Sequence, residues 1–178
     1  MKTTGISGRI WILTDKSGRL IEDIDTDQIF HNAHLHVTDV AEMGGYALGN
    51  LEGWQDFPNL ALTGDILLAG RNFGAGSSRQ QAVDCFSALQ IAMIIAPSFG
   101  AIYFRNAVNS GFPVLCCPQL AELMAKGLQN GDNIKVDVLE GKGEIPELHE
   151  SFTLTPMSQV QFDIWRAGSL FAYARTEK

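Results

Sequence analysis

Residues 65–91 read DILLAGRNFGAGSSRQQAVDCFSALQI, and this run carries the strongest structural signal in the chain. Its first part, Asp65 to Ala69, is a short apolar segment typical of a buried strand. Its last part, Gln80 to Ile91, repeats apolar residues with the spacing of one helix face. The ten residues between them include three glycines and end in Ser77-Ser78-Arg79. The pattern predicts a strand, a glycine loop and a helix whose N-terminus faces the loop.

A loop of this kind favours a bound anion, because glycines let a ligand approach and the helix N-terminus offers free N–H groups and a positive dipole end. Three better-known glycine loops do not match. A dinucleotide fingerprint and a nucleophile elbow require glycine where Arg79 stands, and a Walker loop requires Gly-Lys-Ser/Thr at positions 76–78. We therefore expect a small-anion site, for a carboxylate. The alternative is that Ser77 or Ser78 only caps the helix and Arg79 is solvated.

Strand-like and helix-like segments alternate along the chain, with short connections. After the first strand and a helix at 80–89, we expect a strand at 91–96, a helix at 101–110 and a strand at 113–116. This order predicts an α/β fold, a parallel sheet core with covering helices. We also expect strands at 10–13 and 133–139, a helix at 157–165 and a mobile loop from Gly44 to Pro58.

Composition limits the class of protein. With 178 residues, 46% of them hydrophobic, the chain is long enough to bury a core, and we expect a single domain over 1–178. A net charge of -7 without a basic run argues against nucleic acid as a partner. No signal-peptide core is apparent, and no apolar run approaches the roughly 20 residues that cross a membrane. We expect a cytoplasmic protein with no membrane partner.

Four segments resemble motifs of the swivelling β/β/α domain of the aconitase superfamily. Asn72–Arg79 is similar to its Gly-Ser-Ser-Arg signature, and Asp25–Ile29 to its opening motif. Ser98–Ala107 resembles its second helix segment, and Trp165–Gly168 its closing motif. The length of the chain is similar to that of the free-standing small subunits of 3-isopropylmalate dehydratase and related hydro-lyases. The resemblance implies a separate large subunit that carries a [4Fe-4S] cluster, in a heterodimer or heterotetramer.

The cysteines of this chain are not expected to hold that cluster. Cys85, Cys116 and Cys117 are an odd number of thiols in apolar surroundings, which indicates reduced, buried residues rather than a disulfide framework. Two of them are adjacent, without the spacing typical of cluster ligation. We expect no metal in this chain and a cluster supplied by another chain, so that this chain alone is catalytically incomplete.

Two other groups of polar residues suggest metal sites that the spacing does not support. An EF-hand loop counted from Asp23 places Gln28 where glycine belongs and His34 where the bidentate glutamate belongs. Asp25 and Asp27 are read either as turn formers and caps or, from the resemblance, as residues that line the cleft facing the partner. The histidines at 31, 34 and 36 lack a fourth ligand for zinc or copper.

The chain departs from the family pattern at two places. Relatives usually carry an arginine after the Asp-Thr-Asp motif, in a segment like Pro-Ala-Arg-Tyr-Leu, whereas residues 31–35 read HNAHL. No lysine or arginine occurs between Arg19 and Arg71, so a histidine such as His34, a partner residue or a different substrate must compensate. Many relatives also read Arg-Glu-His-Ala where this chain has Arg79-Gln80-Gln81-Ala82, and the missing charge and imidazole argue against a proton relay through these two glutamines.

The resemblance also implies a mechanism. It implies that Ser77 would act as the catalytic base, stabilised by the helix N-terminus and loop N–H groups in a closed, dry site, while iron on the large subunit would supply Lewis acidity to the substrate hydroxyl. The guanidinium of Arg79 would bind a carboxylate of a small dicarboxylate substrate through two hydrogen bonds. The further substrate-binding candidates are Ser78, Gly76, Asp27 and His34. For Arg105 and Arg166, helix-cap or salt-bridge roles are favoured over ligand contact.

The function expected from this resemblance is dehydration and rehydration of 2- and 3-isopropylmalate in leucine biosynthesis. The enzymatic alternatives are the small subunits of homoaconitase and of citraconate (methylmalate) or 2,3-dimethylmalate hydro-lyases. They would share Ser77 and Arg79 and differ at residues 30–36 and 44–58. The alternative from another class is a non-catalytic carboxylate-binding or assembly module.

Overall fold

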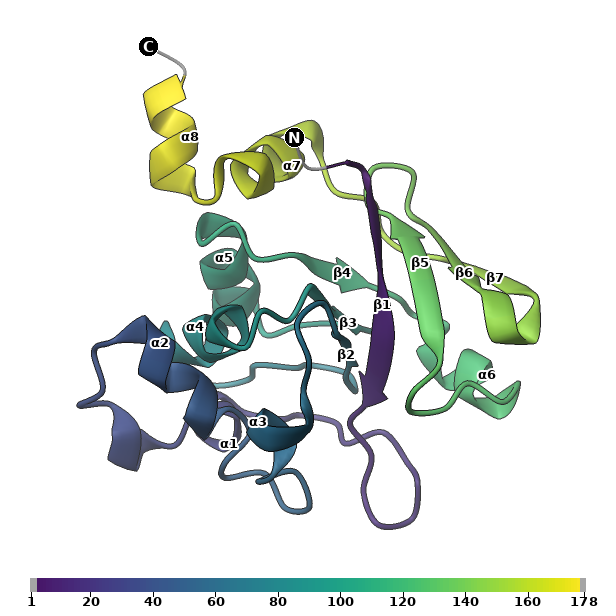
Figure 1. Cartoon of the computed structure of the whole chain (residues 1–178), viewed down its shortest axis with the longest axis horizontal. Coiled ribbons are helices and arrows are strands. Elements are labelled where there is room, and N and C mark those ends of the chain that lie inside the picture. Colours follow the sequence, from purple (N-terminus) through teal and green to yellow (C-terminus); the bar gives the residue numbers. More distant parts are fainter. Residues whose placement is uncertain (1–2, 177–178) are drawn as a thin grey trace.

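The computed structural model describes residues 3–176, and within them the strands form a seven-stranded sheet (Figure 1). The strands are β1 (Gly5–Ile12), β2 (Ile66–Leu68), β3 (Met93–Ala96), β4 (Val114–Cys116), β5 (Asn133–Asp137), β6 (Lys142–Ile145) and β7 (Glu150–Thr153). Their order across the sheet is β4-β3-β2-β1-β5-β6-β7. The sequence therefore predicted the correct α/β class and the strand-helix alternation of residues 65–116.

Strand β1 joins a parallel half of the sheet to an antiparallel half. Its C-terminal residues pair in parallel with β2, and β2, β3 and β4 continue the parallel half. Its N-terminal residues, Gly5 to Arg9, pair antiparallel with β5, followed by β6 and β7. The expected parallel core is thus present in β1–β4. The antiparallel extension was foreseen only as a strand at 133–139, and β1 begins earlier than the expected Ile10.

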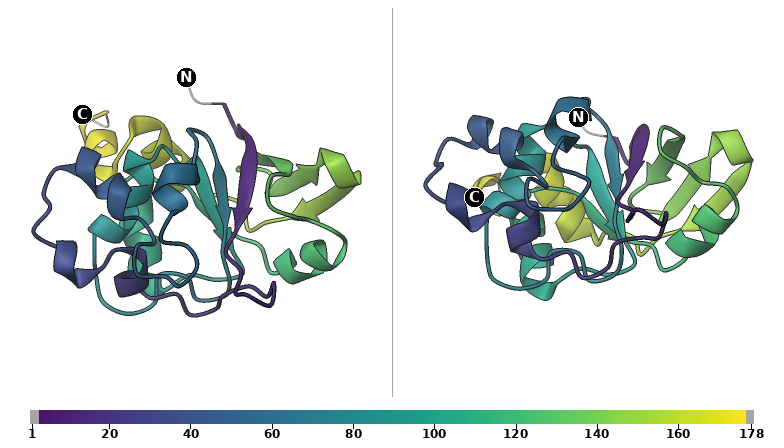
Figure 2. Two further views of the ribbon diagram at one scale, coloured as in Figure 1. Left: turned by 60° about the horizontal axis from the view of Figure 1, so that its bottom comes forward. Right: turned by 90° about the horizontal axis from the view of Figure 1, so that it is seen from below.

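Helices cover both faces of the parallel half. Those of four residues are α1 (Thr26–Ile29), α2 (Val40–Met43) and α3 (Phe57–Leu60), and the longer ones are α4 (Gln81–Ala88), α5 (Ala101–Asn109), α6 (Leu120–Ala125), α7 (Gln159–Ala167) and α8 (Leu170–Thr176). In β2, Leu67 packs with α4 and α5, whereas Ile66 and Leu68 face a second core that includes α6 and α7. Figure 2 shows helices α1–α5 on one side of β1 and the β5–β7 extension on the other.

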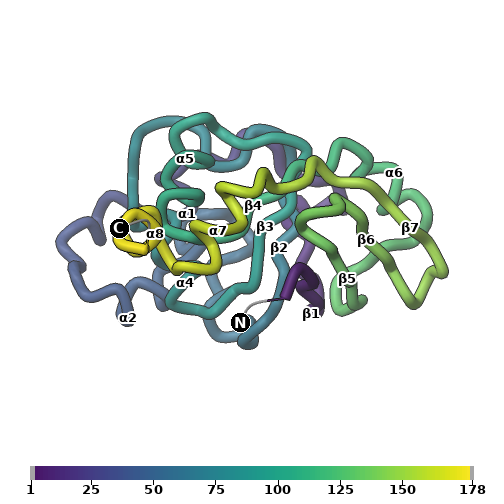
Figure 3. Tube along the Cα trace, turned by 90° about the horizontal axis from the view of Figure 1, so that it is seen from above, coloured from purple at the N-terminus to yellow at the C-terminus, as the bar shows by residue number. Residues whose placement is uncertain are grey.

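The chain returns across the molecule after β7. Figure 3 follows it from the extension back over the sheet to α7 and α8, which lie beside α5. The expected helix at 157–165 is found at 159–167, with Ser158 as its N-cap and Gly168 as a left-handed C-cap. In residues 3–176, no helix combines the length and apolar character needed to span a bilayer.

The segment from Gly44 to Pro58 is a loop for most of its length, because residues 47–56 form no regular helix or strand. It also includes a 3-10 helix at Gly44–Tyr46 and the start of α3, and it buries Leu48, Leu51 and Phe57 in the core shared with α4. Its apolar side chains thus pack against neighbouring elements. The mobility expected of this loop stays a prediction.

Candidate functional site

The glycine loop between β2 and α4 is held by close backbone contacts. Gly74 has φ +77°, and a Cβ at this position would lie 2.2 Å from the ring of Tyr103. The N–H groups of Gly74 and Ala75 both donate to the carbonyl of Ile24, and Thr26 N–H donates to Ala75 O. The loop is therefore fastened to the segment just before α1, and only glycine fits at position 74.

The expected cap role of Ser77 or Ser78 is not found. Helix α4 starts at Gln81, its N-cap is Gln80, and no side chain caps it. The Gln80 amide instead donates to Asp84 Oδ1 at 2.9 Å and to Ser110 Oγ at 2.7 Å. Within residues 3–176, the backbone N–H groups of the six residues from Gly76 to Gln81 have no hydrogen-bond acceptor. They form a row of free donors at a helix N-terminus, which favours an anion.

Both serines of the loop are exposed, with polar neighbours. Ser77 Oγ lies 3.4 Å from Thr26 Oγ1, and Thr26 Oγ1 donates to Ser77 O at 3.2 Å. Thr26 is buried, with 3% of its surface exposed. Ser78 Oγ accepts from Asn106 Nδ2 at 3.3 Å. Thr26 and Asn106 are contacts that the sequence did not single out, although Thr26 stands inside the quoted Asp-Thr-Asp motif.

Arg79 points back toward α1 rather than into solvent. Its side chain is only 12% exposed. Its Nη1 donates to Asp27 Oδ1 at 2.9 Å, to Phe30 O at 2.6 Å and to Thr26 O at 3.3 Å. In the described part of the chain, Nε and Nη2 have no such partner. The reading of Arg79 as a solvated first-turn residue is therefore wrong.

Asp27 completes this arrangement. Hydrogen bonding from Arg79 lowers the pKa of Asp27, with help from Asn32 N–H against the opposing effect of burial. Its Oδ2 also accepts from Asn50 Nδ2 at 3.1 Å. Asp25 has a different role, because its carboxylate accepts from Asp27 N–H and Gln28 N–H in a capping box at the start of α1. The cap reading is thus correct for Asp25, whereas Asp27 is an ion-pair partner.

The three histidines lie next to this site but do not converge on a common point. His34 stacks on Tyr46, with ring centroids 4.2 Å apart, and its ring lies 6.1 Å from that of His31 and 6.5 Å from that of His36. His31 Nδ1 accepts from Ala33 N–H, while His31 Nε2 lies 3.9 Å from Asp27 Oδ2. In residues 3–176, no three His, Cys, Asp or Glu side chains gather as a metal site.

The cysteines do not suit cluster ligation either. Cys85 and Cys117 are buried, and Cys116 is partly buried. Burial raises the pKa of the Cys85 thiol and that of Cys116, and it raises the pKa of Cys117 to about 11. A thiol must lose its proton to bind iron, so these residues do not fit the cluster that the resemblance implies.

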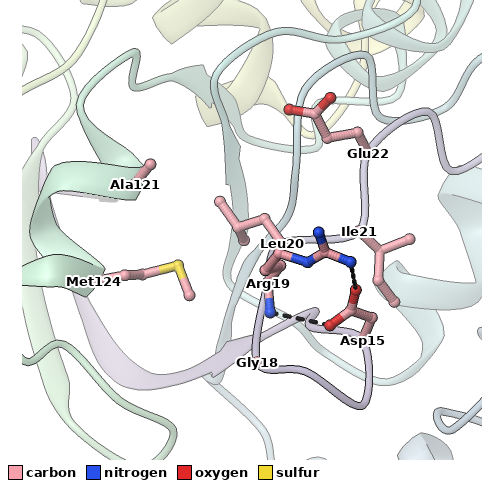
Figure 4. A pocket seen from close by; sticks show the side chains of 8 residues that line it. All are labelled: Asp15, Gly18, Arg19, Leu20, Ile21, Glu22, Ala121 and Met124. Atoms are coloured by element: carbon pink, nitrogen blue, oxygen red, sulfur yellow. Dashed lines mark hydrogen bonds and ion pairs between the residues drawn. The ribbon is translucent and has the colours of Figure 1, made fainter.

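The two further arginine candidates lie on different helices. Arg105 lies exposed on α5, and Arg166 stacks over Phe162 at 5.8 Å. Among the described residues neither forms a salt bridge, but Arg166 lies in the last turn of α7, a position compatible with the helix-end role. A cavity of about 660 Å³ opens elsewhere, between α6 and residues 15–22, lined by Arg19, Glu22 and Met124 among others (Figure 4). It includes no residue of the glycine loop, in which Gly76, Ser77 and Ser78 are exposed.

The fold and the loop define a class, the aconitase swivelling domain, and residues 52–119 match the family model described as the aconitase C-terminal domain. The chain is 34% identical to the 3-isopropylmalate dehydratase small subunit of Caldicellulosiruptor saccharolyticus, over 93% of this chain and 92% of that protein. It is 33% identical to the small subunit of Aquifex aeolicus, over 94% and 93%. The chain belongs to the family of 3-isopropylmalate dehydratase small subunits.

A solved structure supports the same assignment. The crystal structure of 3-isopropylmalate dehydratase from Methanocaldococcus jannaschii matches with a TM-score of 0.83 and 28% identity, over 97% of this chain and 95% of that one. The family and fold class predicted from the four sequence motifs are therefore confirmed.

Proposed function

We propose that this chain is the small subunit of a two-subunit hydro-lyase that interconverts 2- and 3-isopropylmalate by dehydration and rehydration. The observation that carries the proposal is the juxtaposition of exposed Ser77, six free N–H groups and the Arg79 guanidinium in one loop. Family membership supplies the class of reaction, and this loop supplies the groups that the class requires. The working complex is proposed to be a cytoplasmic heterodimer or heterotetramer.

Ser77 is proposed as the group that removes the substrate proton. A serine hydroxyl is a poor base in water, so its deprotonated form requires nearby donors and exclusion of water. The free N–H groups of residues 76–81 and the dipole of α4 supply positive potential beside its Oγ. Thr26 Oγ1 lies 3.4 Å from Ser77 Oγ, and its single hydrogen, which is directed to Ser77 O, would have to turn to the deprotonated Oγ to stabilise it. Because Ser77 is exposed in this chain, the exclusion of water is assigned to the partner subunit.

Arg79 is proposed to hold a substrate carboxylate through Nε and Nη2, the two nitrogens left free while Nη1 is bound to α1. A guanidinium edge binds a carboxylate with two parallel hydrogen bonds, which lysine cannot copy. The oxygens of Asp27 already accept from Arg79, Asn32 and Asn50. Asp27 is therefore assigned to orienting Arg79, and Gly76 and Ser78 to donating backbone N–H groups. His34, stacked on Tyr46, is the candidate for a second substrate contact.

The iron-sulfur cluster is assigned to the large subunit, because the thiols of this chain are buried with raised pKa values and no ligand set gathers in residues 3–176. Its iron, when bound there, would supply Lewis acidity to the substrate hydroxyl. The part played by this chain is to bind and orient the dicarboxylate, remove or return a proton at Ser77 Oγ, and form one wall of the site.

The test is an anaerobic hydration assay with a reconstituted large subunit, with and without this chain. The substrates are isopropylmaleate, citraconate, dimethylmaleate and the homoaconitate alkene. We expect turnover only with both chains and fastest on isopropylmaleate. A different preferred alkene would assign one of the related hydro-lyase activities. The absence of turnover on all four substrates, with an intact cluster and a formed complex, would contradict the proposal and favour a carboxylate-binding module.

The role of Ser77 has its own variant and control. Ser77→Ala should lower turnover on the order of a thousandfold, equivalent to about 4 kcal/mol of barrier. Ser87→Ala is the matched control, since Ser87 is an exposed serine near the other end of α4. Turnover of the Ser77→Ala complex at the wild-type rate would refute the proposed base.

A further inference from the structure

The arginines of this chain fall into two groups. The four that precede residue 100 each form an ion pair with a carboxylate, at 2.6 to 3.3 Å: Arg9, Arg19, Arg71 and Arg79. The three that follow, Arg105, Arg166 and Arg175, form none with any residue in the described range 3–176. They lie exposed on α5, α7 and α8, three helices that contact one another. In a chain with net charge -7, three unpaired arginines on adjoining helices require an explanation.

The same helices expose large apolar side chains. Phe171, in the first turn of α8, is 82% exposed, more than any other large hydrophobic residue in the described range. Leu170 beside it and Ile102 on α5 are each 37% exposed. Leaving a phenylalanine in water forgoes about 1.5–3 kcal/mol relative to burying it. Exposed aromatic residues flanked by arginines are typical of protein interfaces.

This surface adjoins the glycine loop. Helix α5 contacts the loop through Asn106, which donates to Ser78, and the loop contacts Ser110 through Gln80. Just beyond α5, Gly111 packs so closely on Gly168 that a Cβ would lie 2.7 Å from its carbonyl carbon. Gly168 leads directly into α8, which Figures 1 and 3 show beside α5. A partner that covers Ser77 and Ser78 is therefore within reach of α8.

We propose that α8 and the exposed residues of α5 form a docking surface for the large subunit. Phe171 is the central apolar contact, and Arg105 and Arg175 face carboxylates of the partner. The inference rests on the proposed function, because it takes the large subunit as the occupant. Neither α5 nor residues 170–176 of α8 carry an acidic side chain, so charge complementarity predicts an acidic rim on the partner. Two copies of this chain meeting symmetrically would oppose like charges there.

The experiment is a calorimetric titration of the cluster-loaded large subunit with this chain under anaerobic conditions. Phe171→Ser should raise the Kd about tenfold or more, as expected for loss of a buried aromatic anchor. Arg175→Glu should also raise the Kd, mainly through slower association, and salt should reduce the difference. At saturating large subunit, the turnover of Phe171→Ser should equal that of the wild type, because Phe171 lies outside the catalytic machinery.

Matched controls separate docking from general surface effects. Leu62→Ser removes another exposed apolar side chain, 60% exposed and located between α3 and β2, and Lys135→Glu reverses another cation, on β5. Both should bind like the wild type, and thermal unfolding should show all variants folded.

Wild-type Kd values for Phe171→Ser and Arg175→Glu would overturn this inference and leave the proposed function intact. Failure of the wild-type chain to bind would overturn both. If the wild-type chain self-associates, Phe171→Ser abolishes this self-association and the Kd for the large subunit is unchanged, the surface would belong to an interface with a second copy of this chain.

Discussion

At the residue scale, the proposed base Ser77 lies beside a residue that is distant in the sequence. Thr26 and Ser77 are separated by 51 positions, yet their hydroxyl oxygens lie 3.4 Å apart. Since Thr26 is buried and also holds the Ser77 carbonyl, it fixes where the Ser77 hydroxyl lies. We therefore regard Thr26 as a positioning residue for the proposed base.

The prediction for Thr26 is a loss of turnover without a loss of substrate binding. Thr26→Val keeps the side-chain volume and removes the hydroxyl. Loss of about 1 kcal/mol of hydrogen bonding should lower kcat about fivefold to tenfold at unchanged KM. Steady-state kinetics of the reconstituted complex measure both constants. Thr155→Val, at an exposed threonine after β7, is the control, and equal kcat values for the two variants would rule out this role.

Asp65 gives a prediction about stability and pH. Its carboxylate is 4% exposed and accepts from Arg9, Trp11 Nε1 at 2.7 Å and Leu62 N–H at 2.8 Å. Burial raises the pKa of Asp65, but these donors outweigh it and leave the pKa below the usual value of 3.8. The ionised form is therefore stabilised in the folded state above pH 3.8, and this contribution is lost as the pH falls through the lower, folded pKa.

Asp65→Ala should consequently lower the free energy of unfolding by about 1–3 kcal/mol at pH 7, because it leaves the Trp11 and Leu62 N–H donors without an acceptor and Arg9 without its ion-pair partner. The loss should shrink below pH 3.8. Urea unfolding at several pH values measures both effects. Glu144→Ala, at an exposed position of β6, should change little. An Asp65→Ala cost that is the same at pH 7 and pH 3 would contradict the assigned pKa direction.

At the scale of elements, local sequence patterns located the regular structure well. The helices at 80–89 and 101–110 are found at 81–88 and 101–109, and the strands at 65–69 and 113–116 at 66–68 and 114–116. Periodicity predicted them because each has one clear apolar face or a continuous apolar run. The missed elements are β6 and β7, which have four residues each, and the helices α1, α2, α3, α6 and α8, which have four to seven. Such short segments have too few residues to show a period.

The element-scale prediction concerns the glycine loop. Gly74→Ala should destabilise the protein by about 3 kcal/mol or more, because it adds a left-handed backbone penalty to a clash with Tyr103. Gly18→Ala is the matched control. Gly18 has φ +80°, but no atom lies within 4 Å of the added Cβ, so its cost should be only about 1–2 kcal/mol. Thermal or urea unfolding compares them, and equal costs would argue against the packing role of Gly74.

At the scale of the whole molecule, the site lies in the parallel half of the sheet, away from the β5–β7 extension (Figures 1 and 2). Gly76, Ser77 and Ser78 are exposed in this chain. Under the proposed function, the chain contributes one wall of the site. The closed, dry environment that the proposed base requires has to arise on assembly.

Assembly should be visible in amide hydrogen exchange. The free N–H groups of residues 76–81 should exchange fast in the isolated chain and at least about tenfold more slowly in the complex with the large subunit. The β5–β6 turn at residues 139–141 serves as the control, because it lies beyond β1 from the loop and should exchange alike in both states. Unchanged exchange at residues 76–81 in a formed complex would show that the partner does not cover the loop.

The alternation of strands and helices over residues 65–116, the glycine loop and the family of this chain could be predicted from the sequence. These depend on local periodicity and on motifs that are contiguous in the chain. Only the tertiary structure decided that Arg79 turns back to Asp27, that Thr26 lies against Ser77, and that Arg105, Arg166 and Arg175 form no ion pair within residues 3–176. The physical reason is distance along the chain. Contacts between residues some fifty positions apart depend on sheet order and loop packing, which no local pattern encodes.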